Sequence, residues 1–463
     1  MKILIIGAGR VGASVAESLV SERNDITVID VDVQQLAALQ DRLDLRTLAG
    51  NGTQPSVLRD AGAEDADMLI AVARQDETNL VACQIAQRLF NVPTRIARVR
   101  SAEFQEYPGL MGKEGFDVDY VICPEQTVTN TILRLIEFPE ALQVMEFADG
   151  RVGLIASRAY AGGPLVGNPI MDLRRHIPSV DTRIVAIFRG EHAVRPEGDT
   201  TIEAGDEVFF LAASEHVRSV MAELRRMDKP VRRVMIAGGG NIGLRLARSL
   251  WDRYEVKIVE TGKRRCEYLA SQLPDSTLIL NGDSTDADLL ESENVRDMDL
   301  FVAVTSLDEN NIMACLLAKR LGARRVIALI NRRAYAELME GSRIDIAIVP
   351  AQTTIGELLA HIRRGDVVAV HSLRRGAAEA LEAIAHGDSK SSKVIGKRID
   401  QIDLPRGATI GAIVREAAGA GSDVIMAHHD TVIEPEDHVI VFVSNKRIIP
   451  KVEKLFQVGV AFF

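Results

Sequence analysis

The chain has 463 residues, of which 47% are hydrophobic and 26% are charged, and this composition excludes a disordered chain, a collagen and a small disulfide-stapled protein. At about 150 residues per domain it has room for about three domains. Its net charge of -10 gives no electrostatic support to nucleic-acid binding, so we expect no nucleic-acid partner.

The start of the chain gives no sign of a targeting segment. Residues 1–6 lead directly into a glycine loop, and this apolar run is too short for a signal peptide. No apolar stretch approaches the roughly 18 residues that span a bilayer. We therefore expect a cytoplasmic protein, and action at a membrane requires a partner that holds it there.

The first 140 residues alternate short apolar runs with amphipathic ones. Strands are expected at 2–6, 26–30, 69–73 and 95–99, with helical patterns at 11–22 and 78–90. This alternation predicts a parallel sheet with helices on both faces. From about residue 141 the pattern changes to short alternating runs, such as RIVAIF at 183–188, and predicts a small β-rich module with one or two helices.

The whole arrangement then recurs, which is the strongest feature of the sequence. The matched segments are KILIIGAGRVG at 2–12 with RVMIAGGGNIG at 233–243, GNGT at 50–53 with LNGD at 280–283, ADMLIAV at 66–72 with MDLFVAV at 298–304, DETN at 76–79 with DENN at 308–311, and TIEAGDEVFFLAASEHV at 201–217 with VIEPEDHVIVFVSNKRI at 432–448. We predict an α/β fold of two tandem Rossmann-like parallel-sheet domains, each followed by a small β-rich α+β module. The expected boundaries are 1–140, 141–228, 232–366 and 367–455.

The glycine loop of the first copy has the spacing of a dinucleotide-binding fingerprint. Gly7 permits a tight turn, Gly9 lets the backbone approach a pyrophosphate, and Gly12 lets helix and strand pack closely. The free N–H groups and the dipole of the following helix favour phosphates. A glycine turn that binds nothing is the alternative, but the strand–loop–helix context occurs twice.

A carboxylate follows each loop at the position that holds ribose hydroxyls. Asp30 ends the second strand about 20 residues on, and Asp32 adds negative charge nearby. A 2′-phosphate would be repelled there, so we expect NAD(H) or adenosine nucleotides rather than NADP. The second copy keeps the glycines and has Glu260 in place of Asp30, and we expect it to bind less tightly, because duplicated sites often decay.

Further candidates lie where strands end. Asn51 and Asn281 each precede a glycine after the third strand, and either approach an adenosine or form a plain turn. Ala73 and Arg74 end the fourth strand, at the edge that lines a ligand crevice. Arg98 or Arg100 would reach a phosphate bidentately, unless both lie on a solvated sheet edge. In the second copy only Arg332 or Arg333 remains for this role.

Residues that would indicate catalysis or metal binding are lacking. The four cysteines, Cys83, Cys123, Cys266 and Cys315, form no C-x-x-C pair, and Cys83 and Cys315 fit a helix core. Nothing beside His428 and His429 supplies converging metal ligands. The sequence has neither a P-loop nor a G-x-S-x-G elbow. We therefore expect no enzyme and no metal site. The alternative for such a nucleotide-binding chain is a soluble NAD-dependent oxidoreductase.

The order of Rossmann unit, small module, Rossmann unit and small module resembles the RCK (KTN) domains, which regulate potassium conductance. Two such units in one chain are similar to the TrkA family, the cytosolic regulatory subunits of bacterial Trk-type potassium uptake. The resemblance covers about residues 1–225 and 232–455.

The resemblance implies a role in gating rather than chemistry. It implies a peripheral subunit on the inner face of the membrane, bound to a potassium channel or transporter and assembled as a homotetrameric ring. NAD(H) and ATP or ADP would compete for the crevices and change the shape of the ring. The alternative to this role is a free-standing nucleotide sensor with a non-channel partner. The implied nucleotide contacts are Gly7, Ala8, Gly9, Arg10, Val11, Asp30, Ala73, Arg74 and Arg98, with Gly238, Gly239, Gly240, Asn241, Ile242 and Glu260 as their second-copy counterparts.

Overall fold

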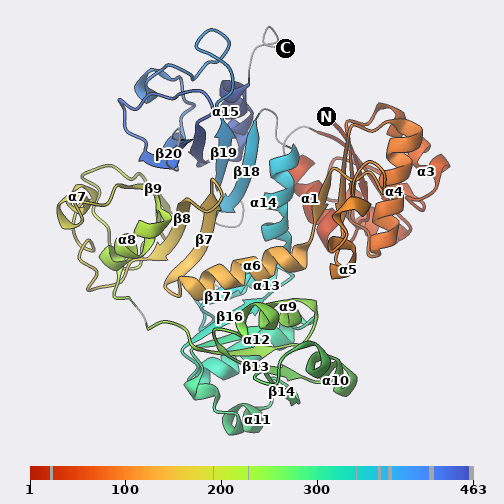
Figure 1. The fold of residues 1–463 in the computed structure, drawn as a ribbon, viewed down its shortest axis with the longest axis horizontal. Coiled ribbons are helices and arrows are strands. Elements are labelled where there is room, and N and C mark those ends of the chain that lie inside the picture. Colours follow the sequence, from red (N-terminus) through yellow and green to blue (C-terminus); the bar gives the residue numbers. More distant parts are fainter. Residues whose placement is uncertain are drawn as a thin grey trace. The chain divides into compact units, whose positions relative to one another are not determined.

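The computed structural model describes residues 1–463 except 21–23, 191, 228, 340, 363–365, 374–377, 417–421 and 458–463 (Figure 1). It contains two six-stranded parallel sheets and two five-stranded antiparallel sheets, which confirms the predicted fold class. The chain divides into two compact units. The first comprises residues 1–128 and 350–361, and the second comprises residues 129–349 and 362–463.

The first parallel sheet has the strand order β3-β2-β1-β4-β5-β6. Its strands are β1 (Lys2–Ile6), β2 (Asp25–Asp30), β3 (Arg46–Ala49), β4 (Met68–Ala71), β5 (Thr94–Arg98) and β6 (Tyr120–Ile122). The four strands predicted with bounds are confirmed, with ends shifted by up to two residues. The third strand expected before Asn51 is β3, and β6 is additional. The order reverses between β1 and β4, and in such sheets the ligand crevice lies outside the carboxyl ends of the strands at this point.

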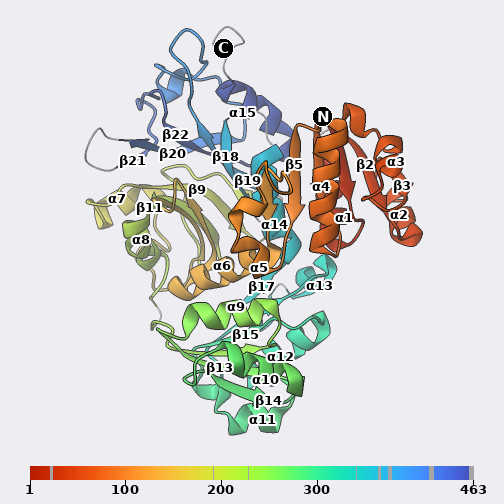
Figure 2. The same cartoon turned by 45° about the vertical axis from the view of Figure 1, so that its right-hand side comes forward.

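Helices cover both faces of this sheet. They are α1 (Arg10–Val20), α2 (Val33–Gln40), α3 (Pro55–Asp60), α4 (Asp76–Phe90), α5 (Ala102–Gln105) and the first turn of α6 (Pro124–Glu137). Figure 2 shows α1 and α4 lying along the strands. The core follows from the apolar stripes of these helices, since α4 buries Leu80, Cys83 and Ala86 against β4 and β5, while α1 buries Val15 and Leu19.

The second parallel sheet repeats the first in the order β14-β13-β12-β15-β16-β17. Its strands are β12 (Arg233–Ala237), β13 (Glu255–Glu260), β14 (Leu278–Asn281), β15 (Leu300–Ala303), β16 (Arg325–Leu329) and β17 (Ile346–Ile348). Its helices are α9 (Asn241–Leu250), α10 (Lys263–Gln272), α11 (Ala287–Ser292), α12 (Asp308–Arg320) and α13 (Arg333–Leu338).

The helix that follows this sheet, α14 (Pro350–Ile362), belongs almost wholly to the first unit. Thr127 of α6 donates its hydroxyl to Glu357 of α14 at 2.7 Å. The ring of His361 stacks on Tyr120 of β6, with centroids 3.7 Å apart. The helix therefore packs on the first parallel sheet by side-chain contacts that are distant in sequence.

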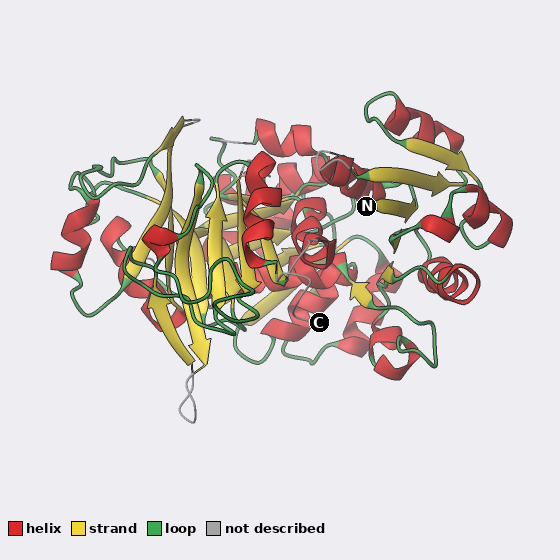
Figure 3. Cartoon of the chain, turned by 90° about the horizontal axis from the view of Figure 1, so that it is seen from above, coloured by secondary structure: helices red, strands yellow, loops and turns green. Residues whose placement is uncertain are grey.

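Both antiparallel sheets lie in the second unit and share one strand order. The first runs β10-β9-β11-β8-β7 and the second runs β21-β20-β22-β19-β18. Their elements are β7 (Ala141–Phe147), β8 (Val152–Arg158), α7 (Leu173–His176), β9 (Thr182–Arg189), β10 (His192–Val194), β11 (Glu207–Ala213) and α8 (Val217–Leu224), then β18 (Val367–Leu373), β19 (Ala378–Ile384), β20 (Ala408–Glu416), β21 (Ser422–Met426), β22 (His438–Val443) and α15 (Ile449–Phe456). Figure 3 shows their long strands in yellow.

A single hydrophobic core joins these two sheets. Phe147, Phe209 and Leu211 from the first sheet pack with Ile440 and Phe442 from the second. Polar contacts cross the same interface, because Glu382 accepts from the backbone N–H of Ala148 at 2.9 Å. The two small modules therefore form one body.

Candidate nucleotide-binding sites

The first glycine loop is held by the protein backbone at Gly7 and Gly12. Gly7 donates its N–H to Ile29 at 2.8 Å and has a φ of +106°, a conformation that L side chains rarely adopt. A Cβ at Gly12 would lie 1.8 Å from the carbonyl oxygen of Gly7. The fold itself therefore requires glycine at both positions.

Gly9 differs from its two neighbours because the fold does not require it. Its φ is not positive, and the nearest atom to a Cβ built there is Oε1 of Gln35, at 4.0 Å. The residue is exposed and immediately precedes α1, whose first N–H groups lie beside it. A side chain at Gly9 would occupy only the open space in front of the helix N-terminus.

Asp30 lies where the sequence placed it, at the carboxyl end of β2. Its Oδ2 accepts from the N–H of Ala8 at 2.5 Å, and its Oδ1 accepts from the N–H of Asp32 at 2.8 Å. The carboxylate therefore fixes the glycine loop and remains half-buried at its rim.

Two buried polar residues of α4, Asp76 and Asn79, shape the opposite rim and were not assigned a role from the sequence. Asn79 accepts from the N–H of Ala73 at 2.8 Å and donates to the carbonyls of Ala73 and Arg98 at 3.1 and 2.9 Å. Asp76 accepts from the N–H of Arg100 at 2.9 Å. The sequence feature that could have indicated them is the DETN segment at 76–79, which recurs as DENN at 308–311.

The structure brings the candidate arginines to this same rim, at the ends of β4 and β5. Arg98 pairs with Glu125 at 3.3 Å, and Arg100 donates to the carbonyl of Arg74. The side chain of Arg74 is exposed. Asn51 lies after β3, where its side chain accepts from Thr53 and forms the turn into α3.

The second loop reproduces the first. Gly238 has a φ of +106°, and a Cβ at Gly243 would lie 2.0 Å from the carbonyl oxygen of Gly238. A Cβ at Gly240 has no described atom within 4 Å. Glu260 accepts from the N–H groups of Gly239 and Gly262, both at 2.8 Å. The exposed Asn241 and half-buried Ile242 open α9, as Arg10 and Val11 open α1.

One sequence correspondence is wrong. Gly50 and Gly282 make the same hydrogen bond, to the carbonyls of Asp30 and Glu260, so the residue equivalent to Asn51 is Asp283 and not Asn281. Asp283 accepts from the N–H and the hydroxyl of Thr285, as Asn51 does from Thr53. Asn281 instead ends β14 and donates to the carbonyls of Glu260 and Thr261.

The buried pair of α4 recurs in α12. Asn311 accepts from Thr305 at 2.9 Å and donates to Leu329 at 2.8 Å, and Asp308 accepts from the N–H groups of Asn331 and Arg332. These bonds make Leu329 and Asn331 the counterparts of Arg98 and Arg100. Arg332 forms an ion pair with Glu309 at 3.1 Å, and Arg333 forms one with Glu337 at 2.9 Å.

The cysteine prediction is confirmed for the two equivalent helices. Cys83 and Cys315 are fully buried, and desolvation raises the pKa of both thiols far above the ordinary value. Within the described ranges no three His, Cys, Asp or Glu side chains converge as a metal site. Likewise, no helix among the described residues is long and apolar enough to cross a bilayer.

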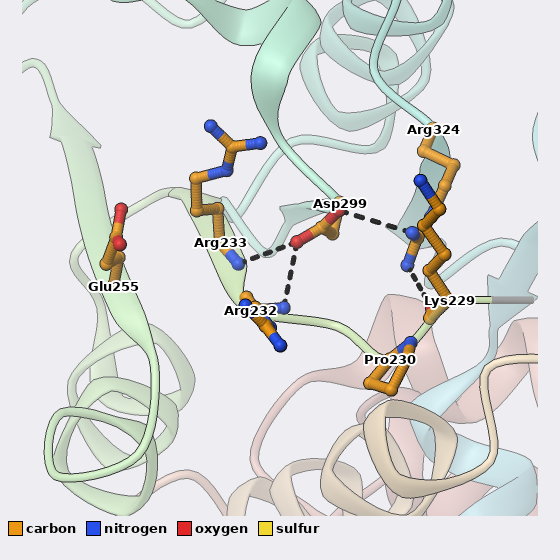
Figure 4. A pocket seen from close by; sticks show the side chains of 7 residues that line it. All are labelled: Lys229, Pro230, Arg232, Arg233, Glu255, Asp299 and Arg324. Carbon is orange, nitrogen blue, oxygen red and sulfur yellow. Dashed lines mark hydrogen bonds and ion pairs between the residues drawn. The ribbon is translucent and has the colours of Figure 1, made fainter.

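An open pocket of about 460 Å³ lies at the opposite, amino edge of the second parallel sheet (Figure 4). Asp299 accepts there from the N–H groups of Arg232 and Arg233 and pairs with Arg324, which donates to the carbonyl of Lys229. These bonds fasten the segment that leads into β12. We assign the pocket to this junction.

Comparison with known proteins identifies the family. The model of the TrkA-N domain matches residues 3–124 and 234–350, and that of the TrkA-C domain matches residues 154–225 and 389–457. The Trk system potassium uptake protein TrkA of Halomonas elongata is 57% identical over all of both chains, and that of Vibrio alginolyticus is 53% identical over 99% of each. The chain belongs to the TrkA family.

TrkA relatives are named for potassium uptake and not for a catalysed reaction, which agrees with the expectation that the chain is no enzyme. Solved structures support the fold. The GsuK channel matches with a TM-score of 0.61 at 17% identity, and the GsuK channel bound to NAD matches with 0.60 at 17%, each over 98% of this chain and 78% of the other. The GsuK RCK domain matches with 0.60 at 16%, over 98% and 94%.

Proposed function

We propose that this TrkA-family chain is the nucleotide-binding regulatory subunit of a Trk-type potassium uptake system. It binds NAD(H), ATP or ADP at the two glycine loops and acts from the inner face of the membrane on a channel or transporter subunit. It does so as a homotetrameric ring whose shape depends on which nucleotide is bound.

The observation that carries this proposal is the pair of glycines that the fold does not need. Gly7, Gly12, Gly238 and Gly243 are each fixed by backbone geometry, whereas Gly9 and Gly240 face open space. An exposed position with ordinary φ tolerates most residues. Glycine at both equivalent positions is explained by a ligand whose pyrophosphate lies against the backbone.

The surrounding groups supply the rest of the recognition. The N–H groups at the start of α1 and α9 face the same open space and suit phosphate oxygens. Each carboxylate oxygen of Asp30 and Glu260 accepts one backbone hydrogen bond and retains a lone pair, so a ribose hydroxyl can donate to it. Ala73, Arg74, Arg98 and Arg100 form the facing rim in the first site.

Gating by such sites requires no chemistry. A nucleotide shifts a two-state ring only through its different affinity for the two shapes. Carrying a gate from mostly closed to mostly open takes about 5.5 kcal/mol in total. Shared among several sites, this asks about 1 kcal/mol of each.

Calorimetric titration of the full chain with NADH and with ATP tests binding. Gly9→Val and Gly240→Val should each remove one class of site while the chain stays folded. Gly109→Val is the matched control, because a Cβ at Gly109 meets no described atom within 4 Å and the residue belongs to neither glycine loop. Absence of adenine-nucleotide binding by the unaltered chain would overturn the proposal.

Potassium flux into membrane vesicles that hold the Trk-type membrane subunit tests gating. We expect the Gly9→Val chain to remain bound to the vesicles while flux loses its response to ATP or NADH. A folded variant that binds no nucleotide at the first site and yet keeps the full response would refute gating by that site.

A further inference from the structure

The two nucleotide sites carry opposite charge where the second strand meets its helix. Residues 30–35 of the first site read DVDVQQ, with two acids and no cation, whereas residues 260–265 of the second read ETGKRR, with one acid and three cations. The positions correspond, because α2 and α10 each begin three residues after the acid.

Three cations lie at the N-terminus of a helix, where positive charge is unfavourable. Lys263, Arg264 and Arg265 form the first turn of α10, at the end whose dipole repels positive charge. The N-cap residue, Gly262, offers the helix no side-chain hydrogen bond, whereas Asp32 caps α2 by accepting from two N–H groups. The start of α10 therefore presents uncapped N–H groups together with three cations.

Arg265 aims this charge at the glycine loop. Its Nε donates to the carbonyl of Gly239 at 2.6 Å, and its guanidinium lies 4.7 Å from the ring centroid of Tyr268. Its Nη2 is buried and has no hydrogen-bond partner among the described residues. Glu260 holds the N–H of the same Gly239, so the guanidinium stands beside the carboxylate expected to face the ribose.

The first site has an amide in the place of this guanidinium. Gln35, the counterpart of Arg265, donates its Nε2 to Asp32 at 3.0 Å. On the facing rim the difference is reversed, since Arg98 and Arg100 correspond to Leu329 and Asn331. The second site therefore gains positive charge on the ribose side, while its facing rim has Arg332 and Arg333 just beyond the positions of Arg98 and Arg100.

In Rossmann domains an acid at the end of the second strand accepts from a ribose 2′-hydroxyl, whereas a nearby arginine accommodates a 2′-phosphate. We propose that the second site selects adenine dinucleotides with a phosphate on the ribose 2′-oxygen, and that the first site selects the unphosphorylated form. Three cations outweigh the charge of Glu260 within residues 260–265, whereas residues 30–35 of the first site contain no cation. A change of the Arg265 rotamer exposes its Nη2, which has no hydrogen-bond partner among the described residues, and lets it donate to the phosphate. This inference rests on the proposed nucleotide function.

Titration of the full chain with NADPH and NADH tests the inference. In a Gly9→Val chain, which leaves only the second site, NADPH should bind at least about tenfold more tightly than NADH, the scale of one hydrogen bond between charged groups. Adding Arg265→Gln should weaken NADPH binding by about 10- to 100-fold and leave NADH binding nearly unchanged. Arg265→Lys, which keeps the charge, should lose less.

The reciprocal exchange is made in a Gly240→Val chain. Asp32→Gly with Gln35→Arg gives the first site the second site's residues and should raise its affinity for NADPH relative to NADH. If the unaltered chain binds NADH but the Gly9→Val chain shows no preference for NADPH, or if Arg265→Gln weakens both ligands equally, this inference is overturned and the proposed function stands. If the unaltered chain binds neither dinucleotide nor ATP, both fail.

Discussion

The two parallel-sheet domains share their backbone hydrogen bonds and differ in their charges. Each has the same strand order, a first glycine at a φ of +106°, and a carboxylate that accepts from the residue after that glycine. Each also has a buried Asp and Asn that fix the ends of the fourth and fifth strands. The groups that would face a ligand instead change between the copies, from Gln35 to Arg265 and from Arg98 to Leu329.

This difference separates the residues that hold the backbone of the crevice from the side chains that would contact a ligand. A group that satisfies backbone N–H and C=O groups cannot be exchanged without leaving a buried polar group unpaired, so both copies retain it. A divergent rim side chain bonds to the backbone in one copy only, as Arg265 does to the carbonyl of Gly239, so the crevice forms without it in the other copy. Substitutions of the retained residues should therefore lower the stability of both domains equally. Substitutions of the divergent residues should instead change the affinity of one site for one ligand.

The largest expected effect is on stability, at the third glycine of each loop. Gly12→Ala and Gly243→Ala place a Cβ within 2.0 Å of a backbone oxygen, and relieving that clash should cost about 3 kcal/mol or more. Gly9→Ala and Gly240→Ala should stay within about 0.5 kcal/mol of the unaltered chain. Thermal unfolding monitored by circular dichroism checks all four.

Equal destabilisation by Gly9→Ala and Gly12→Ala would contradict the distinction between fold-required and ligand-required glycines. A difference between Gly12→Ala and Gly243→Ala would instead contradict the equivalence of the two loops.

The next effect concerns the buried asparagines. Asn79→Ala and Asn311→Ala each leave backbone groups of two strand ends unpaired, and should each destabilise their domain by about 2–4 kcal/mol. Hydrogen exchange of the amides of Ala73 and Thr305 reports the two losses separately. Unchanged protection at both amides would show that these bonds do not hold the rim.

The sequence predicted the repeat, the glycine loops, the carboxylates and four strands of the first sheet. These features are local, since each is a short pattern of apolar, glycine and acidic residues. It gave no bounds for β3 and missed β6, which are four and three residues long, and β3 alternates little, with its residues exposed or half-buried. Short edge strands are defined by their neighbours rather than by their own pattern.

Two site features also escaped prediction. The role of DETN required knowing that Asp76 and Asn79 face the ends of two strands up to 25 residues away. The pairing of Asn51 with Asn281 failed because α10 has ten residues where α2 has eight, which shifts later correspondences by two. Identical Asn-Gly pairs then outweighed the true match, which only the shared hydrogen bonds of Gly50 and Gly282 reveal.

A smaller effect is expected on ligand affinity in the first site alone. Asp30→Ala removes a charged acceptor for a ribose hydroxyl and should weaken NADH binding there by about 1.5–3 kcal/mol. The loop N–H of Ala8 also loses its partner, so Asp30→Asn, which keeps an oxygen acceptor, serves as the comparison. Calorimetry on the Gly240→Val background measures both. Unaltered affinity in Asp30→Ala would exclude the assigned role.

The smallest expected effect distinguishes the two antiparallel sheets by pH. His371 of β18 corresponds to Met145 of β7. Burial lowers the pKa of His371 to about 4, and its Nε2 lies 3.0 Å from the carbonyl oxygen of Glu146. The ring also packs edge-on against Phe147, at a centroid distance of 4.8 Å. The neutral imidazole is therefore the form that fits the core between the sheets.

The unfolded chain binds a proton at this histidine near its ordinary pKa of 6.5, whereas the folded chain does so only near pH 4. The contribution of His371 to stability is therefore fully present above pH 6.5. As the pH decreases toward 4 the free energy of unfolding falls by about 1–2 kcal/mol, a reduced value because the ring is only half-buried. His371→Met, which copies the first module, should remove this part of the acid sensitivity without lowering stability at pH 8. Unfolding curves at pH 8, 6 and 4.5 measure the change. If the variant keeps the same pH slope as the unaltered chain, the acid sensitivity does not arise from His371.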